Sequence, residues 1–243
     1  PLPTRLSFFM PPRRISQRLG LESTLPGSTV EYYKLSYEFS HYWPLSQAFV
    51  LRTGLDLGYG DSYGNDHVRN ICWTNGTYVD TNGDGIQDTY VPGPPPTEPC
   101  LGSSPDFVKT VTATGLPFFE NFYAGGTRSV RGFRDNTLGP RSEPIGGYLG
   151  QPLGGSLKTV GQIEMVFPKL FDSKAARVSA FVDVGNVFNG ANNFDAGELR
   201  ASAGVALLWR APVGPISISY AYPFKKKDGD EIERLQFTFG GGF

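Results

Sequence analysis

The sequence predicts an all-β fold, an antiparallel transmembrane β-barrel of about eight strands. Apolar residues alternate with small or polar residues in segments of about ten residues, which places the two kinds on opposite faces of a strand. The 243 residues are 39% hydrophobic and 14% aromatic, yet no run approaches the ~18 to 20 apolar residues of a membrane helix. Strands must therefore make any crossing of a membrane.

Three alternating segments lie near the N-terminal end. Within each segment the apolar residues share one parity, and the other parity carries residues such as Arg18, Glu38 and Asp56. The apolar positions are Ile15, Leu19 and Leu21; Tyr33, Leu35, Tyr37 and Phe39; and Phe49, Leu51, Leu55, Leu57 and Tyr59. We expect one strand for each segment.

Five further segments follow residue 156. Their apolar positions are Leu157, Ile163, Met165 and Phe167; Val178, Ala180, Val182 and Val184; Leu199, Ala201, Ala203, Val205, Leu207 and Trp209; Ile216, Ile218, Tyr220 and Tyr222; and Leu235, Phe237, Phe239 and Phe243. In the first two, Glu164 and Asp183 fall on the opposite, polar parity. We therefore expect eight strands with lipid on the apolar face and both acids in the lumen.

A soluble β-sandwich would show the same period, because its inner faces are also apolar. Its other face, however, would not be so rich in Gly and Ser while the first face carries many aromatic rings. Aromatic girdles beside a polar lumen are typical of outer-membrane barrels. The composition therefore favours a membrane barrel over a sandwich.

A long connection, residues 60–155, interrupts the alternation. Proline and glycine concentrate within it at residues 92–96. Outer-membrane barrels keep short turns on the periplasmic side and long loops outside, so we expect residues 60–155 to be a long extracellular loop. Residues 1–243 would then form one barrel domain that carries this loop.

A longer motif stands in this connection. Residues 116–133 are LPFFENFYAGGTRSVRGF, and NTLGPR follows at residues 136–141. The stretch closely resembles the loop of the BamA family, the barrel subunits of the bacterial outer-membrane protein assembly machinery. The hallmark of that loop is Val-Arg-Gly-Phe, here Val130, Arg131, Gly132 and Phe133. Similar segments follow at residues 154–155, 163–168, 181–188 and 219–226, so the resemblance covers most of residues 13–243.

The resemblance implies the second half of a barrel of about sixteen strands, which in the family follows periplasmic POTRA domains. It implies a non-enzymatic function in the bacterial outer membrane: the assembly and insertion of β-barrel proteins. The partners would be the lipid bilayer, nascent outer-membrane β-barrel proteins and the lipoproteins of the machinery. The family's seam strand falls on Gly240, Gly241, Gly242 and Phe243, where glycines weaken pairing. A flexible chain end is the alternative for these glycines.

The resemblance also implies that Arg131 folds back into the lumen, as part of a loop lock, and contacts Glu164 and Asp183. A guanidinium between two carboxylates can make charge-assisted, bidentate bonds. Gly132 would allow a tight turn, and Phe133 would pack against lumen side chains. The alternative is an ordinary loop tetrapeptide beside solvated pore charges.

An eight-strand barrel that closed on itself would leave no room for the loop, because its interior holds only its own side chains. In that case we expect Glu164 and Asp183 to pair with Arg177 or Lys158, and Arg131 to stay outside. An open sheet could instead associate with another copy of the chain, since backbone groups in lipid need partners.

Two features of the long loop concern cross-linking and metal binding. Cys72 and Cys100 are the two cysteines, and an oxidising envelope permits a disulfide between them; two free thiols are the alternative. Asp80 to Asp88 has the spacing of an EF-hand or dockerin calcium loop. Val91, however, stands where a bidentate Glu would be expected, and a surface turn rich in Asx and Gly is the alternative. The candidate calcium ligands are Asp80, Asn82, Asp84, Ile86 and Asp88.

Other functions find little support. The net charge of −1 argues against nucleic-acid binding, which normally needs a basic surface. Neither His41 nor His67 has a nucleophile or metal partner at useful spacing, so we expect no enzyme and no required cofactor. A two-partner secretion or translocation pore of the same superfamily and a small passive surface barrel are the alternative functions. Several POTRA repeats ahead of the chain would favour the assembly factor, whereas two would favour the secretion pore.

Overall fold

The computed structural model describes residues 15–28, 30–46, 48–63, 67–73, 77–79, 89–91, 107–113, 116–142, 150–168, 175–212 and 214–240. The chain divides into two compact units, one formed by residues 1–63 with 115–243 and the other by residues 64–114. Among the described residues, no helix has the length and the apolar character needed to span a membrane.

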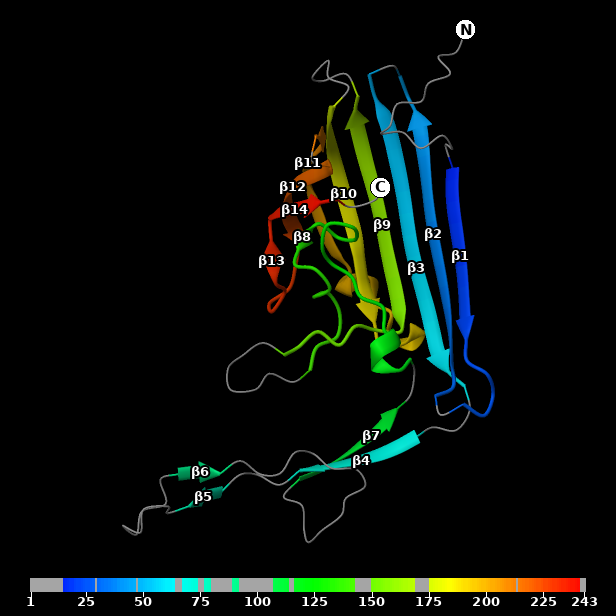
Figure 1. Ribbon diagram of the computed structural model, residues 1–243, viewed down its shortest axis with the longest axis vertical. Coiled ribbons are helices and arrows are strands. Elements are labelled where there is room, and N and C mark those ends of the chain that lie inside the picture. Colours follow the sequence, from blue (N-terminus) through cyan, green and yellow to red (C-terminus); the bar gives the residue numbers. More distant parts are fainter. Residues whose placement is uncertain are drawn as a thin grey trace. The chain divides into compact units, whose positions relative to one another are not determined.

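The larger unit is built on an eight-stranded antiparallel sheet in the order β1-β2-β3-β9-β10-β11-β12-β14 (Figure 1). Each strand corresponds to one of the eight predicted segments. Their bounds are β1 Ile15–Ser23, β2 Tyr32–Pro44, β3 Val50–Ser62, β9 Leu157–Phe167, β10 Ala176–Phe188, β11 Arg200–Ala211, β12 Gly214–Lys225 and β14 Leu235–Phe239. The ladder between β3 and β9, with Val50 opposite Val166, joins the two sides of the long connection.

The two edges of this sheet are β1 and β14, and no ladder joins them within the described residues. The sheet is therefore open in the part of the chain that the structure describes, which fits the half of a larger barrel and not an eight-strand barrel closed on itself. Of the two edges, β14 pairs over five residues, from Leu235 to Phe239, against β12, whereas β1 pairs over nine with β2. The all-β antiparallel class is confirmed, and among the described residues the two outer strands of the sheet pair on one side only.

The two faces of the sheet differ as the alternation predicts. On the outer face, large apolar side chains are exposed, including Leu19 at 70%, Tyr222 at 58% and Phe237 at 62%. The opposite face, called the inner face here, carries Arg52, Gln162, Glu164, Asp183 and Gln236. Such a large contiguous apolar surface would be unstable in water, and it suits contact with lipid.

A loop packs on the inner face and supplies the buried core of this unit. The loop, residues 116–142, is called the lock loop below. Its buried residues Ala124, Val130, Phe133 and Leu138 pack with Val160 of β9 and Val187 of β10. Each fully buried side chain of this size stabilises by about 1.5–3 kcal/mol, so the loop is held by apolar packing as well as by polar contacts.

Short elements complete the larger unit. Two-residue strands β8 (Gly132–Phe133) and β13 (Ile232–Glu233) pair with each other, and η1 (Phe118–Glu120) opens the lock loop. The 3-10 helices η2 (Ala191–Asn193) and η3 (Ala196–Glu198) lie between β10 and β11.

Within the described residues of the smaller unit, the strands form two short antiparallel pairs. β4 (His67–Trp73) pairs with β7 (Phe107–Ala113), and β5 (Thr77–Val79) pairs with β6 (Thr89–Val91). None of these strands was predicted, because the sequence of residues 60–155 shows no sustained alternation. The long connection therefore contains regular β structure that its composition does not reveal.

Candidate functional site

Arg131 makes the most deeply buried ion pair of the lock loop among the described residues. Its Nε lies 2.7 Å from Asp183 Oδ2 and its Nη2 lies 2.9 Å from Asp183 Oδ1, so the pair is bidentate. The backbone N–H of Arg131 donates a third bond to Asp183 Oδ2 at 3.1 Å. The Asp183 side chain is 0% exposed and that of Arg131 is 8% exposed. Charge-assisted bonds in such a dry environment are strong, and a lone partner would be left as a buried charge.

Two further contacts fix the guanidinium of Arg131. Its Nη1 lies 3.7 Å from Glu164 Oε1, and its Cζ lies 3.4 Å from the centre of the Phe181 ring. A cation over an aromatic face gains electrostatic attraction, more so when water is excluded. Phe181 belongs to the polar parity of β10, so its ring faces inward and forms one wall of the arginine site.

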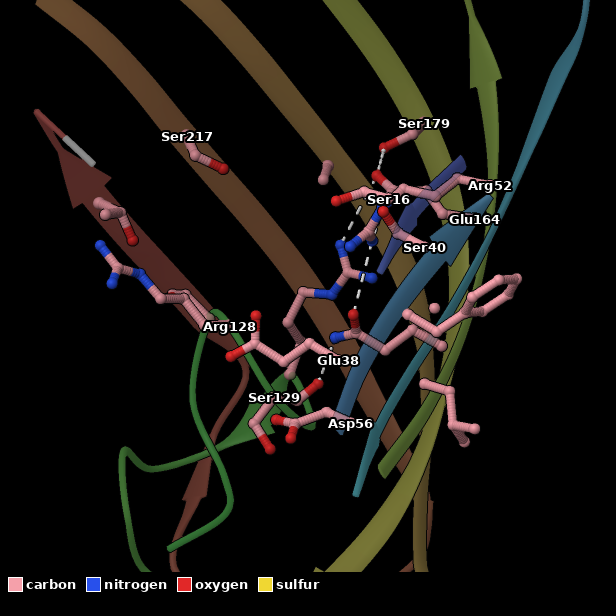
Figure 2. Close-up of a pocket in the computed structure, with 18 of the residues that line it drawn as sticks. Ser16, Glu38, Ser40, Arg52, Asp56, Arg128, Ser129, Glu164, Ser179 and Ser217 are labelled. Atoms are coloured by element: carbon pink, nitrogen blue, oxygen red, sulfur yellow. Dashed lines mark hydrogen bonds and ion pairs between the residues drawn. The ribbon is translucent and has the colours of Figure 1, made fainter. Parts of the chain in front are cut away.

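Glu164 is shared between two arginines. Arg52 Nη1 of β3 lies 3.3 Å from Glu164 Oε2, and Ser179 Oγ of β10 donates to Glu164 Oε1 at 2.5 Å. Figure 2 shows Arg52 and Ser179 directed at Glu164 from neighbouring strands. Two arginines and two carboxylates therefore balance in charge within one cluster that spans β3, β9 and β10.

The cluster borders a polar cavity of about 890 Å³ between the lock loop and the inner face (Figure 2). Lys158 and Asp56, which also line it, form their own ion pair at 2.5 Å. The pairing of Glu164 and Asp183 with Arg177 or Lys158 was expected only for a closed eight-strand barrel, and the sheet here is open. In this open sheet Arg131 lies inside with both acids, and Lys158 pairs with Asp56. Arg131, Glu164 and Asp183, which the family resemblance brings together, lie within one set of contacts.

Gly132 has a backbone conformation that favours glycine, with φ of +89°. A Cβ at this position would lie 2.9 Å from Ala221 Cβ and 3.3 Å from Pro223 Cγ, both on β12. The loop therefore approaches β12 more closely than a side chain would allow. The next residue, Phe133, is completely buried in the core described above.

Gln236 is a contact residue that sequence reasoning missed. Its Oε1 accepts the backbone N–H of Gly132 at 3.1 Å, and its Nε2 donates to the carbonyl of Phe133 at 2.7 Å. The side chain is 3% exposed. The alternation of β14 places Gln236 on the inner face, but nothing in the sequence indicates which backbone groups it meets. Through it, the last strand holds the tip of the lock loop directly.

Gln162 makes a similar contact from β9. Its Nε2 donates to the carbonyl of Ser129 at 2.6 Å. Amide side chains from two strands therefore bind backbone groups on either side of Arg131. Such bonds satisfy buried loop groups that would otherwise be costly.

Several predicted site residues cannot be placed. Gly240 ends the described chain with φ of +69°, and Gly241, Gly242 and Phe243 lie outside the described residues. Cys100 and the candidate calcium ligands also lie outside them, and only the backbone of Cys72, within β4, is described. The predicted disulfide and calcium site therefore stay predictions. The candidate calcium ligands are those named above, Asp80, Asn82, Asp84, Ile86 and Asp88.

An antiparallel sheet with an apolar outer face and a loop bound by ion pairs to its polar inner face defines part of an outer-membrane β-barrel. The chain belongs to the Omp85 superfamily, because the model described as "Omp85 superfamily domain" matches residues 4–243. Membership of this superfamily, together with the relatives below, places the chain in the bacterial outer membrane.

Two curated relatives carry the name "Outer membrane protein assembly factor BamA". The protein of Neisseria meningitidis serogroup B is 31% identical over 265 residues, covering 98% of this chain and 27% of that protein. The protein of Nitratidesulfovibrio vulgaris is 30% identical over 131 residues, covering 53% of this chain and 16% of that protein. A SAM50-like protein of Drosophila melanogaster is 30% identical over 138 residues, covering 56% of this chain and 30% of that protein.

A solved structure has a similar fold. The crystal structure of BamA from Haemophilus ducreyi lacking POTRA domains 1–3 matches with a TM-score of 0.64 and 28% identity, covering 92% of this chain and 37% of that chain. The chain spans about a quarter or less of the curated BamA proteins it matches. It therefore corresponds to a C-terminal barrel region of such a protein.

Proposed function

We propose that this chain is the C-terminal barrel region of an assembly factor that folds and inserts β-barrel proteins in the bacterial outer membrane. The observation that carries the proposal is the buried, bidentate contact of Arg131 with Asp183, which holds the lock loop on the inner face. The function is non-enzymatic. It requires a sheet edge that can exchange partners, not a group that forms or breaks covalent bonds.

The edge at β14 supports this function. Backbone groups at a sheet edge need partners, especially in hydrocarbon. β14 pairs over only five residues, whereas β11 and β12 pair along almost their full length. A short pairing is weaker, so β14 can leave one neighbour and pair with a strand of a nascent β-barrel protein. Gly240, Gly241 and Gly242 would lower the cost of such rearrangement by weakening regular pairing.

The lock loop contributes by fixing the inner face beside that edge. Gln236 lies on β14 and contacts the loop, so the loop limits the positions that the last strand can take. The proposed partners are the lipid bilayer, nascent outer-membrane β-barrel proteins and accessory lipoproteins of the machinery. Calcium binding by the Asp80 to Asp88 segment is proposed as a separate property of the smaller unit and is not needed for this function.

The function is tested with the full-length protein that contains this chain, reconstituted in vesicles of outer-membrane lipid. The measured quantity is the folding rate of an added β-barrel client, followed by its heat-modifiable migration on a gel. We expect Arg131→Ala to lower the rate by about tenfold or more, because loss of the buried pair frees the loop. A wild-type rate in the Arg131→Ala protein would contradict the proposal.

Arg128→Ala is the matched control for this experiment. Arg128 lies in the same loop and is exposed, and it makes no ion pair within the part of the chain that the structure describes. We expect this variant to keep the wild-type rate. Because Arg131→Ala could prevent folding of the factor itself, Arg131→Lys is measured as well: it keeps the charge but loses the bidentate geometry, and we expect an intermediate rate.

A further inference from the structure

The segment between β12 and β14, residues 226–234, makes contacts that involve neither Arg131 nor Asp183. This segment is called the clasp turn here. Asp230 attaches it to the sheet, because Arg200 at the start of β11 forms a bidentate pair with Asp230 through Nε at 2.7 Å and Nη2 at 3.1 Å. The backbone N–H of Lys227 also donates to Asp230 Oδ2 at 2.7 Å. Both charged side chains are at most 10% exposed, so this attachment is firm.

The next residue, Glu231, points to the lock loop instead. Its Oε2 accepts from Arg134 Nη1 at 2.8 Å, and its Oε1 accepts from Arg141 Nη1 at 3.0 Å. Arg141 also donates to the carbonyls of Thr137 and Gly150, at 2.9 and 3.0 Å. Glu231 therefore holds a folded part of the lock loop that begins one residue after Phe133.

Backbone pairing continues the same attachment toward the last strand. The N–H of Arg134 donates to the carbonyl of Glu231 at 2.9 Å, and β13 pairs with β8 so that Ile232 faces Phe133. Three residues beyond β13, Gln236 binds the backbone of Gly132 and Phe133. Residues 230–236 thus form one continuous stretch. It is bound to the sheet through Asp230 and to the lock loop through Glu231 and Gln236, and it leads directly into β14.

We propose that Glu231 is a positioning residue that couples release of the lock loop to movement of β14. The proposal rests on the function proposed above and extends it to the regulation of the β14 edge. A slip of β14 by one residue would turn Gln236 to the outer face and break its two bonds to the loop. Conversely, departure of the loop would pull on residues 231–233 through Arg134, Arg141 and β8. The loop and the strand therefore open together, and the clasp turn transmits the change.

The coupling is tested by hydrogen exchange of the full-length protein in lipid vesicles. Two peptides are followed, one covering residues 128–134 of the lock loop and one covering residues 235–240 of β14. We expect Glu231→Gln to speed exchange in both peptides by a similar factor, roughly three- to tenfold, as for loss of a partly exposed charged bond. Glu233→Gln is the matched control, because Glu233 lies on the same turn, is exposed and forms no ion pair among the described contacts; we expect it to exchange as wild type.

A charge-swapped variant makes the test specific. We expect Glu231→Arg alone to speed exchange in both peptides, and Glu231→Arg combined with Arg134→Glu to restore part of the protection; Arg141 is left unchanged because it also holds the carbonyls of Thr137 and Gly150. Faster exchange confined to residues 226–234, or to only one of the two peptides, would overturn the coupling. If Glu231→Gln fails to fold, Glu231→Asp keeps the charge on a shorter side chain, and we expect a smaller increase in both peptides; an increase in one alone would again overturn it.

Client folding measured in the same vesicles separates this inference from the proposed function. Coupled exchange in a wild-type protein that folds no client would contradict the assembly function and leave the coupling intact. Normal client folding with independent exchange of the two peptides would contradict the coupling and leave the assembly function intact.

Discussion

The lock loop is held at two places that differ in burial. At the first, Arg131 and Asp183 are 8% and 0% exposed, and each would be a buried charge without the other. At the second, Glu231 is 24% exposed and its partners Arg134 and Arg141 are 67% and 17% exposed. Water can solvate the second set when it separates, but not the first. The comparison indicates that Arg131 fixes the position of the loop, whereas Glu231 forms an attachment that can open and close.

Removing one partner of the buried pair should have the largest effect. We expect Asp183→Asn to destabilise the attached lock loop by about 3–5 kcal/mol, because the Arg131 guanidinium would remain buried without its carboxylate. The opening free energy of the loop, measured by hydrogen exchange in lipid vesicles, checks this value. Asp56→Asn is the control: its ion pair with Lys158 is also on the inner face, but Asp56 is 33% exposed. An equal loss of opening free energy in Asp183→Asn and Asp56→Asn would mean that burial does not decide how much each ion pair contributes.

A side chain at Gly132 should have the next largest effect. We expect Gly132→Ala to cost about 1–3 kcal/mol, because the residue has φ of +89° and its Cβ would crowd Ala221. The same exchange measurement would report this loss. Gly27→Ala, with exchange followed in the turn between β1 and β2, would show the cost of conformation alone, because Gly27 also has a positive φ but has open space around its Cβ position. Equal losses at the two glycines would contradict a close approach of the loop to β12.

The amide of Gln236 should contribute less than the buried charges. We expect Gln236→Ala to destabilise the loop by about 1–2 kcal/mol, since the Gly132 N–H loses the acceptor Gln236 Oε1 and the Phe133 carbonyl keeps only its bond from the Gly126 N–H. Exchange of the Gly132 amide is the direct probe, because that N–H is bound to Gln236. Thr238→Ala, on the same face of β14, is the control. Unchanged protection at Gly132 in the Gln236 variant would refute the contact.

The partly exposed attachment should respond to pH. Hydrogen bonds from Arg141 and Arg134 lower the pKa of the Glu231 carboxyl below its ordinary value of 4.5. A carboxyl whose pKa is lowered in the folded state stabilises that state fully above its ordinary pKa, and the stabilisation is lost as pH falls through the lower, folded value. We therefore expect the wild-type excess stability over Glu231→Gln to be constant near neutral pH, to begin to fall below about pH 4.5, and to disappear once the pH is below the lowered, folded pKa of Glu231. Stability differences that do not change with pH would contradict the ionic character of the attachment.

The ion pair of Arg18 and Glu38 is more exposed than the two attachments of the lock loop and should contribute least. Arg18 and Glu38 on β1 and β2 are 78% and 56% exposed and 3.4 Å apart. Exposed pairs of this kind contribute about 0.2–1 kcal/mol at most, so we expect Arg18→Gln to leave the unfolding midpoint almost unchanged. A loss of stability as large as that of Asp183→Asn would mean that the contribution of these ion pairs does not increase with burial.

The strands could be predicted from the sequence because each carries its own alternation. That alternation also placed Glu164 and Asp183 on one face, and the family resemblance then brought Arg131 to them. Gln236 and Glu231 could not be assigned a role, because their partners lie about a hundred residues away in a loop without period. The sequence indicated a seam at the last strand but left open whether the sheet closes on itself, because alternation describes each strand and not which strand lies beside it.

Phe181 and the strand pair β4 and β7 show two further limits. An aromatic ring at a polar position of β10 looks like an exception to the pattern, and only the position of Arg131 explains it as a wall of the arginine site. β4 and β7 are seven residues each. Their pairing could not be predicted, because the surrounding sequence is rich in proline, glycine and polar residues and shows no sustained alternation. Local sequence patterns therefore predict elements, whereas contacts between distant segments require the structure.

A double-mutant cycle on Arg131 and Asp183 tests the central claim most directly. The opening free energy of the lock loop is measured by exchange of the Gly132 amide in the wild-type full-length protein, in Arg131→Gln, in Asp183→Asn and in the double variant. A buried, coupled pair predicts that the double variant loses less than the sum of the two single losses, by about 1–3 kcal/mol. Additive losses, within about 0.5 kcal/mol, would contradict the account, because they would mean that the loop is held on the inner face without this pair.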